Sequence, residues 1–233
     1  EILKLLPKVT VFARVSPDDK LRIIELYRAN GQIIAMTGDG VNDALSLAAA
    51  DLGVSMGKGG TEVAKEASDI VLLDDNFGSI VTAIEEGRNI YQSIQKVILY
   101  LFSTGIGEVL TLVVGMIIGY PMILIASQII WLNFVTDGFL VVALSLEPKE
   151  KNLLDKNTLN QTSGLLISKS MLIRMVIMGT VMMVGSVLMF LVYLPQGALK
   201  AGTIVMTLLA IFQWFNAWNC RSKSSSAIGK NMF

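Results

Sequence analysis

The uneven distribution of apolar residues constrains the fold of this chain more than any other feature. Four segments after residue 96 are long and apolar enough to cross a bilayer as helices, which takes about 20 apolar residues. They cover residues 97–119, 122–146, 170–194 and 201–219. Over the whole chain, 53% of the residues are hydrophobic and only 16% are charged, which is too apolar for an ordinary soluble domain. The second part of the chain is therefore predicted to be an all-α bundle of four transmembrane helices.

The first part, residues 1–76, has a different pattern, in which strand-like and helix-like segments alternate. Strands are expected at residues 9–15, 32–37, 52–56 and 70–73, and helices at residues 17–30, 42–50 and 62–67. Repeated β-α-β alternation predicts an α/β fold with a doubly wound parallel sheet, in which ligands bind at the carboxyl ends of the strands.

Residues 77–96 connect the two parts and have apolar residues at helical spacing on one face. No proline separates this stretch from the first apolar span. We therefore expect one long stalk helix that continues into the membrane, although two helices with a break near Gly87 also fit the pattern. The expected organisation is a soluble region over 1–76, a stalk over 77–96, a transmembrane region over 97–220 and a tail over 221–233.

The charged residues indicate how the chain is oriented. The loop after the second span and the tail contain most of the basic residues outside the soluble region and the stalk, namely Lys149, Lys151, Lys156, Lys169, Arg221, Lys223 and Lys230, whereas the other connections carry only Lys200. Because basic loops tend to stay in the cytoplasm, the soluble region, this loop and the tail are expected on the cytoplasmic side.

Composition also argues against several classes of function. The formal net charge is zero and no basic patch stands out, which argues against a nucleic-acid partner. The chain contains no histidine, so catalytic triads, metal sites and proton shuttles that depend on histidine are excluded. Cys220 is the only cysteine and cannot form a disulfide within the chain.

The most specific segment is TGDGVNDA, residues 37–44, which follows a predicted buried strand and opens a helix. Asp39 and Asp43 are four residues apart and suit Mg²⁺ beside a phosphoryl group, because Mg²⁺ binds through one or two carboxylates plus phosphate oxygens. Gly38 and Gly40 would let the backbone turn sharply and approach the ligand closely. The alternative is an Asp-Gly turn that only ends a strand.

Two other segments bear on this predicted phosphate site. Lys20 lies early in the preceding helix, where an ammonium group could neutralise charge on a phosphoryl group, although by itself it is typical of a solvated helix residue. The segment GVSMGKGGT, residues 53–61, is similar to a P-loop. However, it has three rather than four residues between Gly53 and Gly57, and no Ser or Thr directly follows Lys58. We interpret it as a glycine turn beside the same site.

Two acidic residues lie in the middle of predicted spans, Glu108 in the first and Asp137 in the second. An acid at the bilayer centre costs about 2.5–3.5 kcal/mol on insertion scales, so such residues usually mark ion pathways. Other oxygen-bearing residues recur at helical spacing nearby: Asn133 and Thr136 before Asp137, and Gln213 with Asn216 in the fourth span. Converging oxygens suit a hard cation such as Ca²⁺. For each polar residue alone, interhelical hydrogen bonding is the alternative, and it is expected for Asn216 and Ser103.

Four segments together resemble the P-type ATPases, whose phosphorylation domain belongs to the haloacid dehalogenase superfamily: FARVSPDDK, MTGDGVNDALSL, GVSMGKGGTEVAKEASDIVLLDDNF and IEEGRNIYQSIQK. The resemblance covers essentially the whole chain and implies that the soluble region is the second half of such a phosphorylation domain. It also implies roles for single residues: Asp39 as the Mg²⁺ ligand, Asn42 and Asp43 as supports of the phosphate site, Lys20 in contact with the phosphate, Gly38 beside it and Arg14 near the ATP.

The nucleophile of that family is the aspartate of a DKTGT motif, and this motif does not occur in the sequence. The resemblance implies that the nucleophile precedes Glu1 in the intact protein. We therefore expect the missing N-terminal part of the same pump to be a necessary partner, along with membrane lipid. By itself, the chain is expected to be unable to form the aspartyl-phosphate.

The GE pair at Glu108 and the segment WLNFVTDG resemble the type II calcium pumps of the sarcoplasmic-reticulum kind. In those pumps, the positions matched by Glu108, Asn133, Thr136 and Asp137 coordinate Ca²⁺. Two ligands of one of the two ion sites are replaced, an asparagine by Gly105 and a glutamate by Gln213. The expected function is ATP-driven cation transport, with Ca²⁺ as the favoured cargo and one ion per cycle. Alternatives are a proton or Na⁺ pump of the same family, a membrane-tethered phosphohydrolase, and a channel or scaffold without enzymatic activity.

Overall fold

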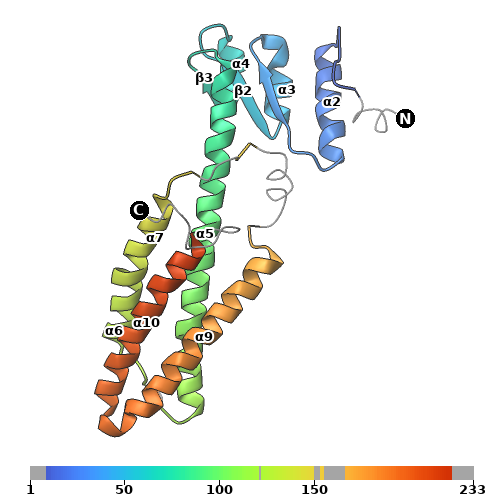
Figure 1. Ribbon diagram of the computed structural model, residues 1–233. Coiled ribbons are helices and arrows are strands. Elements are labelled where there is room, and N and C mark those ends of the chain that lie inside the picture. Colours follow the sequence, from blue (N-terminus) through green and yellow to red (C-terminus); the bar gives the residue numbers. More distant parts are fainter. Residues whose placement is uncertain (1–8, 121, 150–152, 155–165, 222–233) are drawn as a thin grey trace. The chain divides into compact units, whose positions relative to one another are not determined.

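The computed structural model describes residues 9–120, 122–149, 153–154 and 166–221 (Figure 1). The chain divides into two compact units, Glu1–Ala83 and Ile84–Phe233, and each is described by itself.

The first unit contains a three-stranded parallel sheet with the strand order β1-β2-β3. The strands are β1 (Ala35–Gly38), β2 (Leu52–Met56) and β3 (Ile70–Leu72), and the helical segments are α2 (Pro17–Ala29), η2 (Val41–Asp43), α3 (Ala44–Ala49) and α4 (Glu62–Glu66). Thr37 pairs with Val54, and Val54 pairs with Ile70. Because the strands are parallel, the loops that follow them all leave the sheet at the same edge. This edge is where the sequence predicts the phosphate site.

Local sequence explains where the longest helix of this unit begins. Ser16 caps α2, and its side chain accepts a hydrogen bond from the backbone of Asp19, whose carboxylate in turn accepts one from the backbone of Ser16. This reciprocal pair is a capping box, and Pro17 occupies the first helical position, where a missing N–H costs nothing. The predicted helix is therefore confirmed.

The strand expected at residues 9–15 is wrong, because this segment pairs with none of the described strands. Val11 is 77% exposed, and Arg14 has a φ of +57°, which interrupts an extended conformation. Strand β1 also begins at Ala35 rather than at residue 32. An apolar run has the composition of a strand, but it forms one only where a neighbouring strand accepts its hydrogen bonds.

The second unit contains a bundle of helices (Figure 1). Helix α5 (Phe77–Ile117) runs without a break past Gly87, so the prediction of one long helix is confirmed. The described residues include four helices that are long and apolar enough to cross a membrane, as predicted. The second is built from α6 (Ala126–Trp131), η3 (Leu132–Asp137) and α7 (Gly138–Ser145), and the others are α9 (Lys169–Tyr193), followed by the short η4 (Leu194–Gln196), and α10 (Ala198–Cys220).

The second span begins at Ala126, four residues later than expected from residue 122. Ile123 and Leu124 are buried but not helical. The backbone of Ile123 lies so close to Gly202 that a Cβ on this glycine would be 2.7 Å from the Ile123 carbonyl oxygen. These apolar residues therefore pack as part of a non-helical connection, which hydropathy alone does not distinguish from a helix.

Two glycines allow α5 and α9 to approach each other closely beside one of the predicted acids. A Cβ on Gly107 would lie 2.9 Å from the Cβ of Met182, and a Cβ on Gly179 would lie 2.6 Å from Ile106 Cγ2. Small residues at such crossings let helix backbones pack tightly in membranes. The close approach to α9 therefore fixes the position of α5 at Gly107, the residue directly before Glu108.

Candidate functional site

The TGDGVNDA segment joins the end of β1 to η2 and α3, and it brings two predicted site residues together. Lys20 Nζ lies 2.6 Å from Asp43 Oδ1, so the ammonium of α2 and the carboxylate of η2 form an ion pair. Asp43 Oδ2 also accepts a hydrogen bond of 3.3 Å from the backbone of Gly40. Asp43 therefore holds the Lys20 side chain and the turn in one arrangement.

The electrostatics of Asp43 follow from these contacts. Its partial burial by itself would raise the pKa, but the hydrogen bonds from Lys20 and Gly40 and the charge of Lys20 outweigh it, so the pKa is lowered. Asp43 is thus ionised at neutral pH and keeps its ion pair with Lys20.

Gly38 is required for a different reason from the one the sequence indicates. Neither Gly38 nor Gly40 has a positive φ, so a sharp glycine-specific turn is not what this segment needs. Instead, a Cβ on Gly38 would lie 2.6 Å from the Cβ of Asp43, whereas a Cβ on Gly40 would meet only ordinary contacts, the nearest at 3.6 Å. The absence of a side chain at residue 38 leaves room for Asp43, whereas a Cβ at residue 40 would fit.

Asp39, Asn42 and Arg14 are all exposed. Asp39 directly follows β1, and its carbonyl oxygen accepts a hydrogen bond of 2.9 Å from the backbone of Thr61. Arg14 precedes α2, and neither its side chain nor the Asp39 carboxylate makes a hydrogen bond or ion pair with the described residues. The structure therefore leaves the Asp39 carboxylate available to a ligand and does not connect Arg14 to Lys20 or Asp43.

The glycine-rich turn after β2 is held by a residue that the sequence analysis did not single out. Asp75 accepts hydrogen bonds from the backbone of Lys58, at 3.0 Å, and of Gly59, at 2.7 Å. The hydrogen bond from Lys58, and to a smaller extent the one from Gly59, lowers the pKa of Asp75. In a P-loop, backbone N–H groups of this kind bind phosphate; here a carboxylate of the same chain takes their place, in agreement with the interpretation as a turn.

In the second unit, Glu108 is buried and accepts hydrogen bonds from two other predicted site residues. Gln213 Nε2 of α10 donates to Glu108 Oε1 at 2.8 Å, and Asn133 Nδ2 of η3 donates to Glu108 Oε2 at 3.1 Å. Gln213 is 0% exposed, and its Oε1 has no hydrogen-bond partner among the described residues. Side chains of α10 and η3 thus meet the Glu108 carboxylate of α5, and the amide oxygen of Gln213 stays without a partner among the described residues.

Asp137 has a partner that the sequence analysis missed. The hydroxyl of Tyr100, which is 0% exposed, donates to Asp137 Oδ1 at 2.5 Å. Tyr100 lies on α5, 37 positions before Asp137. A tyrosine in an apolar span is normally taken as part of the core or of an interfacial belt, so only the packing of the helices reveals this contact.

The segment that carries Asn133, Thr136 and Asp137 is a π-helix, not the expected α-helix. Thr136 and Asp137 are buried, whereas Asn133 is exposed even though its amide reaches Glu108. The single shared face predicted from α-helical spacing is therefore wrong in detail. Single π-turns within α-helices are frequently found at functional sites.

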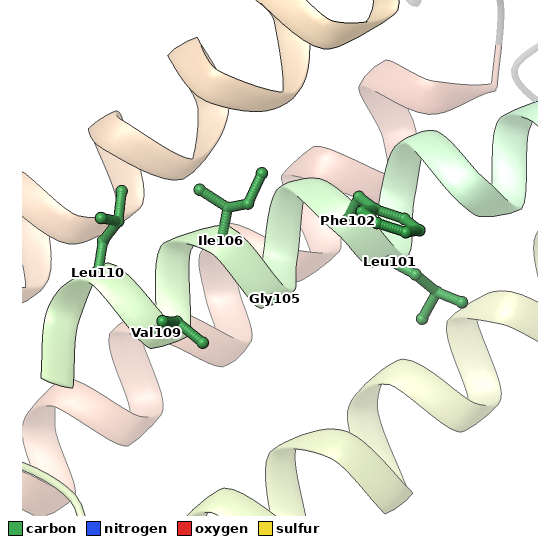
Figure 2. Close-up of a pocket in the computed structure, with 6 residues that line it drawn as sticks. All are labelled: Leu101, Phe102, Gly105, Ile106, Val109 and Leu110. Atoms are coloured by element: carbon green, nitrogen blue, oxygen red, sulfur yellow. The ribbon is translucent and has the colours of Figure 1, made fainter. Parts of the chain in front are cut away.

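Gly105 lies on a face of α5 that borders an apolar groove of about 440 Å³ (Figure 2). A Cβ on this glycine would meet no atom of the described residues within 4 Å. Figure 2 shows Gly105 between Leu101 and Phe102 on one side and Ile106 and Val109 on the other. Gly105, which the resemblance to calcium pumps matches to an asparagine ligand, therefore offers no side-chain ligand here.

One further pair of buried polar residues joins two helices, as expected: Asn216 Nδ2 donates to Ser103 Oγ at 2.6 Å. A contact that the sequence analysis did not single out is made by Arg174, whose Nη2 donates to the carbonyl oxygen of Asn219 at 3.0 Å. This arginine therefore covers the end of α10.

Comparisons with known proteins place these features in a family. The C-terminal region of cation-transporting ATPases matches residues 121–233, and haloacid dehalogenase-like hydrolases match residues 2–51. A calcium-transporting ATPase of Bacillus subtilis (strain 168) is 42% identical over 97% of this chain and 26% of its own length. The human calcium-transporting ATPase type 2C member 1 is 36% identical over 97% of this chain and 25% of its own length. The chain belongs to the P-type cation-transporting ATPases.

This P-type ATPase chain spans about a quarter of the length of those relatives. A solved structure of the catalytic domain of the CPx-ATPase CopB-B is also similar, with 38% identity over 35% of this chain and 33% of that chain. Its TM-score is 0.31, so the family assignment rests on the sequences.

The residues of the phosphate site fit the magnesium ion that membership of this family implies. The Asp39 carboxylate is exposed at the carboxyl end of a parallel strand, and the described residues leave it free for a cation. Asp43 is already neutralised by Lys20, so it is suited to hold this lysine rather than to bind a metal directly. The donor set agrees with the preference of Mg²⁺ for few protein carboxylates and several other oxygens.

The membrane helices of the chain offer a different donor set. Among the described residues, no group of three or more acidic, histidine or cysteine side chains lies close enough to hold a metal ion. A cation bound there would need amide, hydroxyl or carbonyl oxygens in addition to Glu108 or Asp137. The unpaired Oε1 of Gln213 is one such oxygen.

Proposed function

We propose that this chain is part of an ATP-driven cation pump that works through an aspartyl-phosphate, and that its cargo is Ca²⁺. The observation that carries the proposal is the convergence of Gln213 and Asn133 on Glu108 in the middle of a membrane bundle. A buried carboxylate that meets amides from two other helices is expensive to insert, which points to an ion pathway. The similarity to proteins named calcium-transporting ATPases supports Ca²⁺.

In the proposed phosphoryl transfer, Asp39 would hold Mg²⁺, which would screen the charge of the phosphoryl group. Lys20 places its ammonium beside the phosphoryl oxygens and stabilises the charge that develops there. Asp43 orients Lys20, Asn42 and the Gly38 backbone border the phosphate, and Arg14 approaches the nucleotide. The sequence contains no DKTGT motif, so in this proposal the aspartate that accepts the phosphoryl group is supplied by another part of the pump.

In the proposed transport step, the cation is held by oxygens of Glu108, Asn133, Thr136 and Asp137, with the Gln213 amide beside them. The amides that now donate to Glu108 would turn their oxygens toward the ion. Because Gly105 has no side chain oxygen and Gln213 lacks a charge, we propose one Ca²⁺ per cycle. Helix α5 begins beside the soluble sheet in the sequence and contains Glu108, so we propose that it couples phosphorylation to ion release.

The other candidate functions are less well supported. A proton or Na⁺ pump of the same family would also use carboxylates and amides, but the relatives compared above carry calcium in their names. A phosphohydrolase that is only tethered to the membrane needs no buried acids in its spans. We also propose the cytoplasmic side for the soluble unit, on the basis of the basic loop and tail.

The proposal is tested by Asp137→Asn in the full-length protein that contains this segment. Removing the charge of a proposed ion ligand should abolish Ca²⁺-dependent phosphorylation from ATP, while expression in the membrane is retained. Ser186→Ala is a matched control, because Ser186 is also buried in the bundle and its hydroxyl has no partner among the described residues. Unchanged phosphorylation in Asp137→Asn would contradict the proposed site, and a response to Na⁺ or acid instead of Ca²⁺ would contradict the cargo.

A further inference from the structure

One buried hydrogen bond joins α10 to the part of α5 that contains Tyr100, the partner of Asp137. Asn216 Nδ2 donates to Ser103 Oγ at 2.6 Å, although the two residues are 113 positions apart in the sequence. Asn216 is 4% exposed and Ser103 is 0% exposed. Neither residue is a proposed ligand of the cation, so their bond has no part in the proposed contacts with the ion.

The hydroxyl of Ser103 is also bonded to the backbone of its own helix. Its Oγ lies 2.7 Å from the carbonyl oxygen of Leu99 and 2.9 Å from that of Tyr100. Because carbonyl oxygens only accept, the hydroxyl proton is used within α5, and Ser103 accepts its bond from Asn216. The amide of Asn216 therefore presents its NH2 group to α5, while its Oδ1 accepts from the Cys220 thiol at 3.9 Å.

These bonds hold the turn of α5 from which the Tyr100 side chain extends. The carbonyl oxygen of Tyr100 accepts from Ser103 and also from Thr104 Oγ1, the latter at 3.0 Å. Hydroxyls that bond to carbonyls one turn back often bend a helix locally, which changes the direction of nearby side chains. Through Ser103, the amide of Asn216 thus acts on the backbone at Tyr100.

The Tyr100 side chain carries this connection on to the ion site. Its hydroxyl donates to Asp137 Oδ1 at 2.5 Å. Helix α10 therefore reaches both buried acids by different routes. Gln213 contacts Glu108 directly, whereas Asn216, one turn further along α10, is connected to Asp137 through two residues of α5.

We propose that Asn216 is a positioning residue of the cation site, which acts through Ser103 and Tyr100 on Asp137. With the amide in place, the turn at Tyr100 is held and the Asp137 carboxylate is fixed before the ion arrives. Without the amide, part of this ordering has to take place during binding, which lowers affinity. The inference rests on the proposed function, because it takes Asp137 to be a ligand of the transported cation.

The test uses the full-length pump that contains this segment, with phosphorylation from ATP measured against the Ca²⁺ concentration. Asn216→Ala should raise the half-maximal Ca²⁺ concentration about three- to tenfold, as the loss of one neutral hydrogen bond provides, and leave the maximal level of phosphorylation unchanged. Asn219→Ala is the matched control on the same helix. Asn219 is exposed, and its contact with Arg174 uses only the backbone carbonyl, so this variant should respond to Ca²⁺ as the unmutated pump does.

A second substitution separates positioning from a general effect on packing. Tyr100→Phe removes the hydroxyl through which the connection reaches Asp137. In this background, Asn216→Ala should add no further shift beyond about twofold, the scatter expected of such comparisons. Ser103→Ala should reproduce the effect of Asn216→Ala, since each removes the same bond. Phosphorylation from inorganic phosphate without Ca²⁺ should be unchanged in all of these variants, because the phosphate site is in the other unit.

Several results would overturn the inference. An unchanged Ca²⁺ response in Asn216→Ala would show that the bond to Ser103 does not bear on the ion site. Multiplying effects of Asn216→Ala and Tyr100→Phe, or loss of phosphorylation from inorganic phosphate, would show that Asn216 only supports packing. A failure of the proposed function is distinguishable: the unmutated pump would then respond to a different cation, and the same variants measured with that cation would still test Asn216.

Discussion

At the scale of single residues, both sites depend on particular hydrogen-bonding side chains and on close packing that leaves no room for added atoms. Asp43 holds Lys20 in the soluble unit, and Tyr100 contacts Asp137 in the bundle. In each pair one residue, Lys20 or Asp137, has a direct chemical role, and the other, Asp43 or Tyr100, positions it. Substitutions at the positioning residues therefore test the sites without removing the predicted ligands.

Gly38→Ala should destabilise the phosphate site much more than Gly40→Ala. The new Cβ at residue 38 would lie 2.6 Å from the Asp43 Cβ, whereas the one at residue 40 meets its nearest neighbour at 3.6 Å. Overpacking of this kind typically costs about 1–3 kcal/mol. Hydrogen exchange of the amides in β1 and α3, measured by mass spectrometry, should accelerate in Gly38→Ala and change little in Gly40→Ala. Equal effects of the two variants would contradict this account.

Tyr100→Phe should weaken ion binding by the full-length pump. It removes the hydroxyl that donates to Asp137 Oδ1, and a hydrogen bond to a charged group is worth about 1.5–3 kcal/mol. The Ca²⁺ concentration that gives half-maximal phosphorylation should rise by about tenfold or more. Tyr91→Phe is the control on the same helix, because the Tyr91 hydroxyl is buried without a partner among the described residues. An unchanged response to Ca²⁺ in Tyr100→Phe would show that the contact has no positioning role.

At the scale of elements, the parallel sheet brings together three loops that are separate in the sequence. The turn after β1 accepts a hydrogen bond from Thr61, and the turn after β2 donates two to Asp75, which follows β3. Asp75 has a φ of +53°, a conformation that a residue without a glycine's freedom adopts only when its surroundings require it.

Asp75→Ala should loosen the glycine turn specifically. The substitution removes the acceptor for the amides of Lys58 and Gly59 and places alanine at a positive φ, where a side chain is unfavourable. Amide exchange at Lys58 and Gly59 should become faster, as measured by NMR or mass spectrometry. Asp74→Ala should leave this turn protected, since Asp74 accepts instead from Ser79 and Asn76 at the start of α5.

The elements also show what periodicity can and cannot predict. Helix α2, the uninterrupted α5 and the four membrane helices were predictable, because capping residues, hydrophobic spacing and hydropathy act locally. The strand at residues 9–15 was not, because its existence depends on a partner strand. The π-helix at Asn133 and the non-helical Ile123 could not be predicted either, because both follow from contacts with other helices.

At the scale of the whole molecule, the proposed number of ions per cycle depends on two positions, Gly105 and Gln213. No atom of the described residues lies within 4 Å of a Cβ added at Gly105, so an asparagine there meets no obstacle from them. Gln213 is buried against Glu108, and a glutamate in its place would bring a second charge to the same spot. Without a bound cation, two such carboxylates repel each other.

The double variant Gly105→Asn, Gln213→Glu should therefore gain a second Ca²⁺ site in the full-length pump. Equilibrium binding of radioactive Ca²⁺ should show one tight site in the unmutated pump and two in the double variant. Gln213→Glu alone is the control and should bind no second ion, because the asparagine oxygen is absent. Two tight sites in the unmutated pump would contradict the proposed stoichiometry.

The α/β region with a phosphate motif, the one long helix and the membrane bundle that contains acids could all be recognised in the sequence. These features depend on motifs and on periodicities, which neighbouring residues define. The packing of the elements was needed to show that Gln213 and Asn133 meet at Glu108, that Tyr100 contacts Asp137 and that Asp43 rather than Asp39 binds Lys20. These partners lie between 23 and 105 positions apart. Which of them meet depends on how whole elements pack together, and no local pattern in the sequence records that packing.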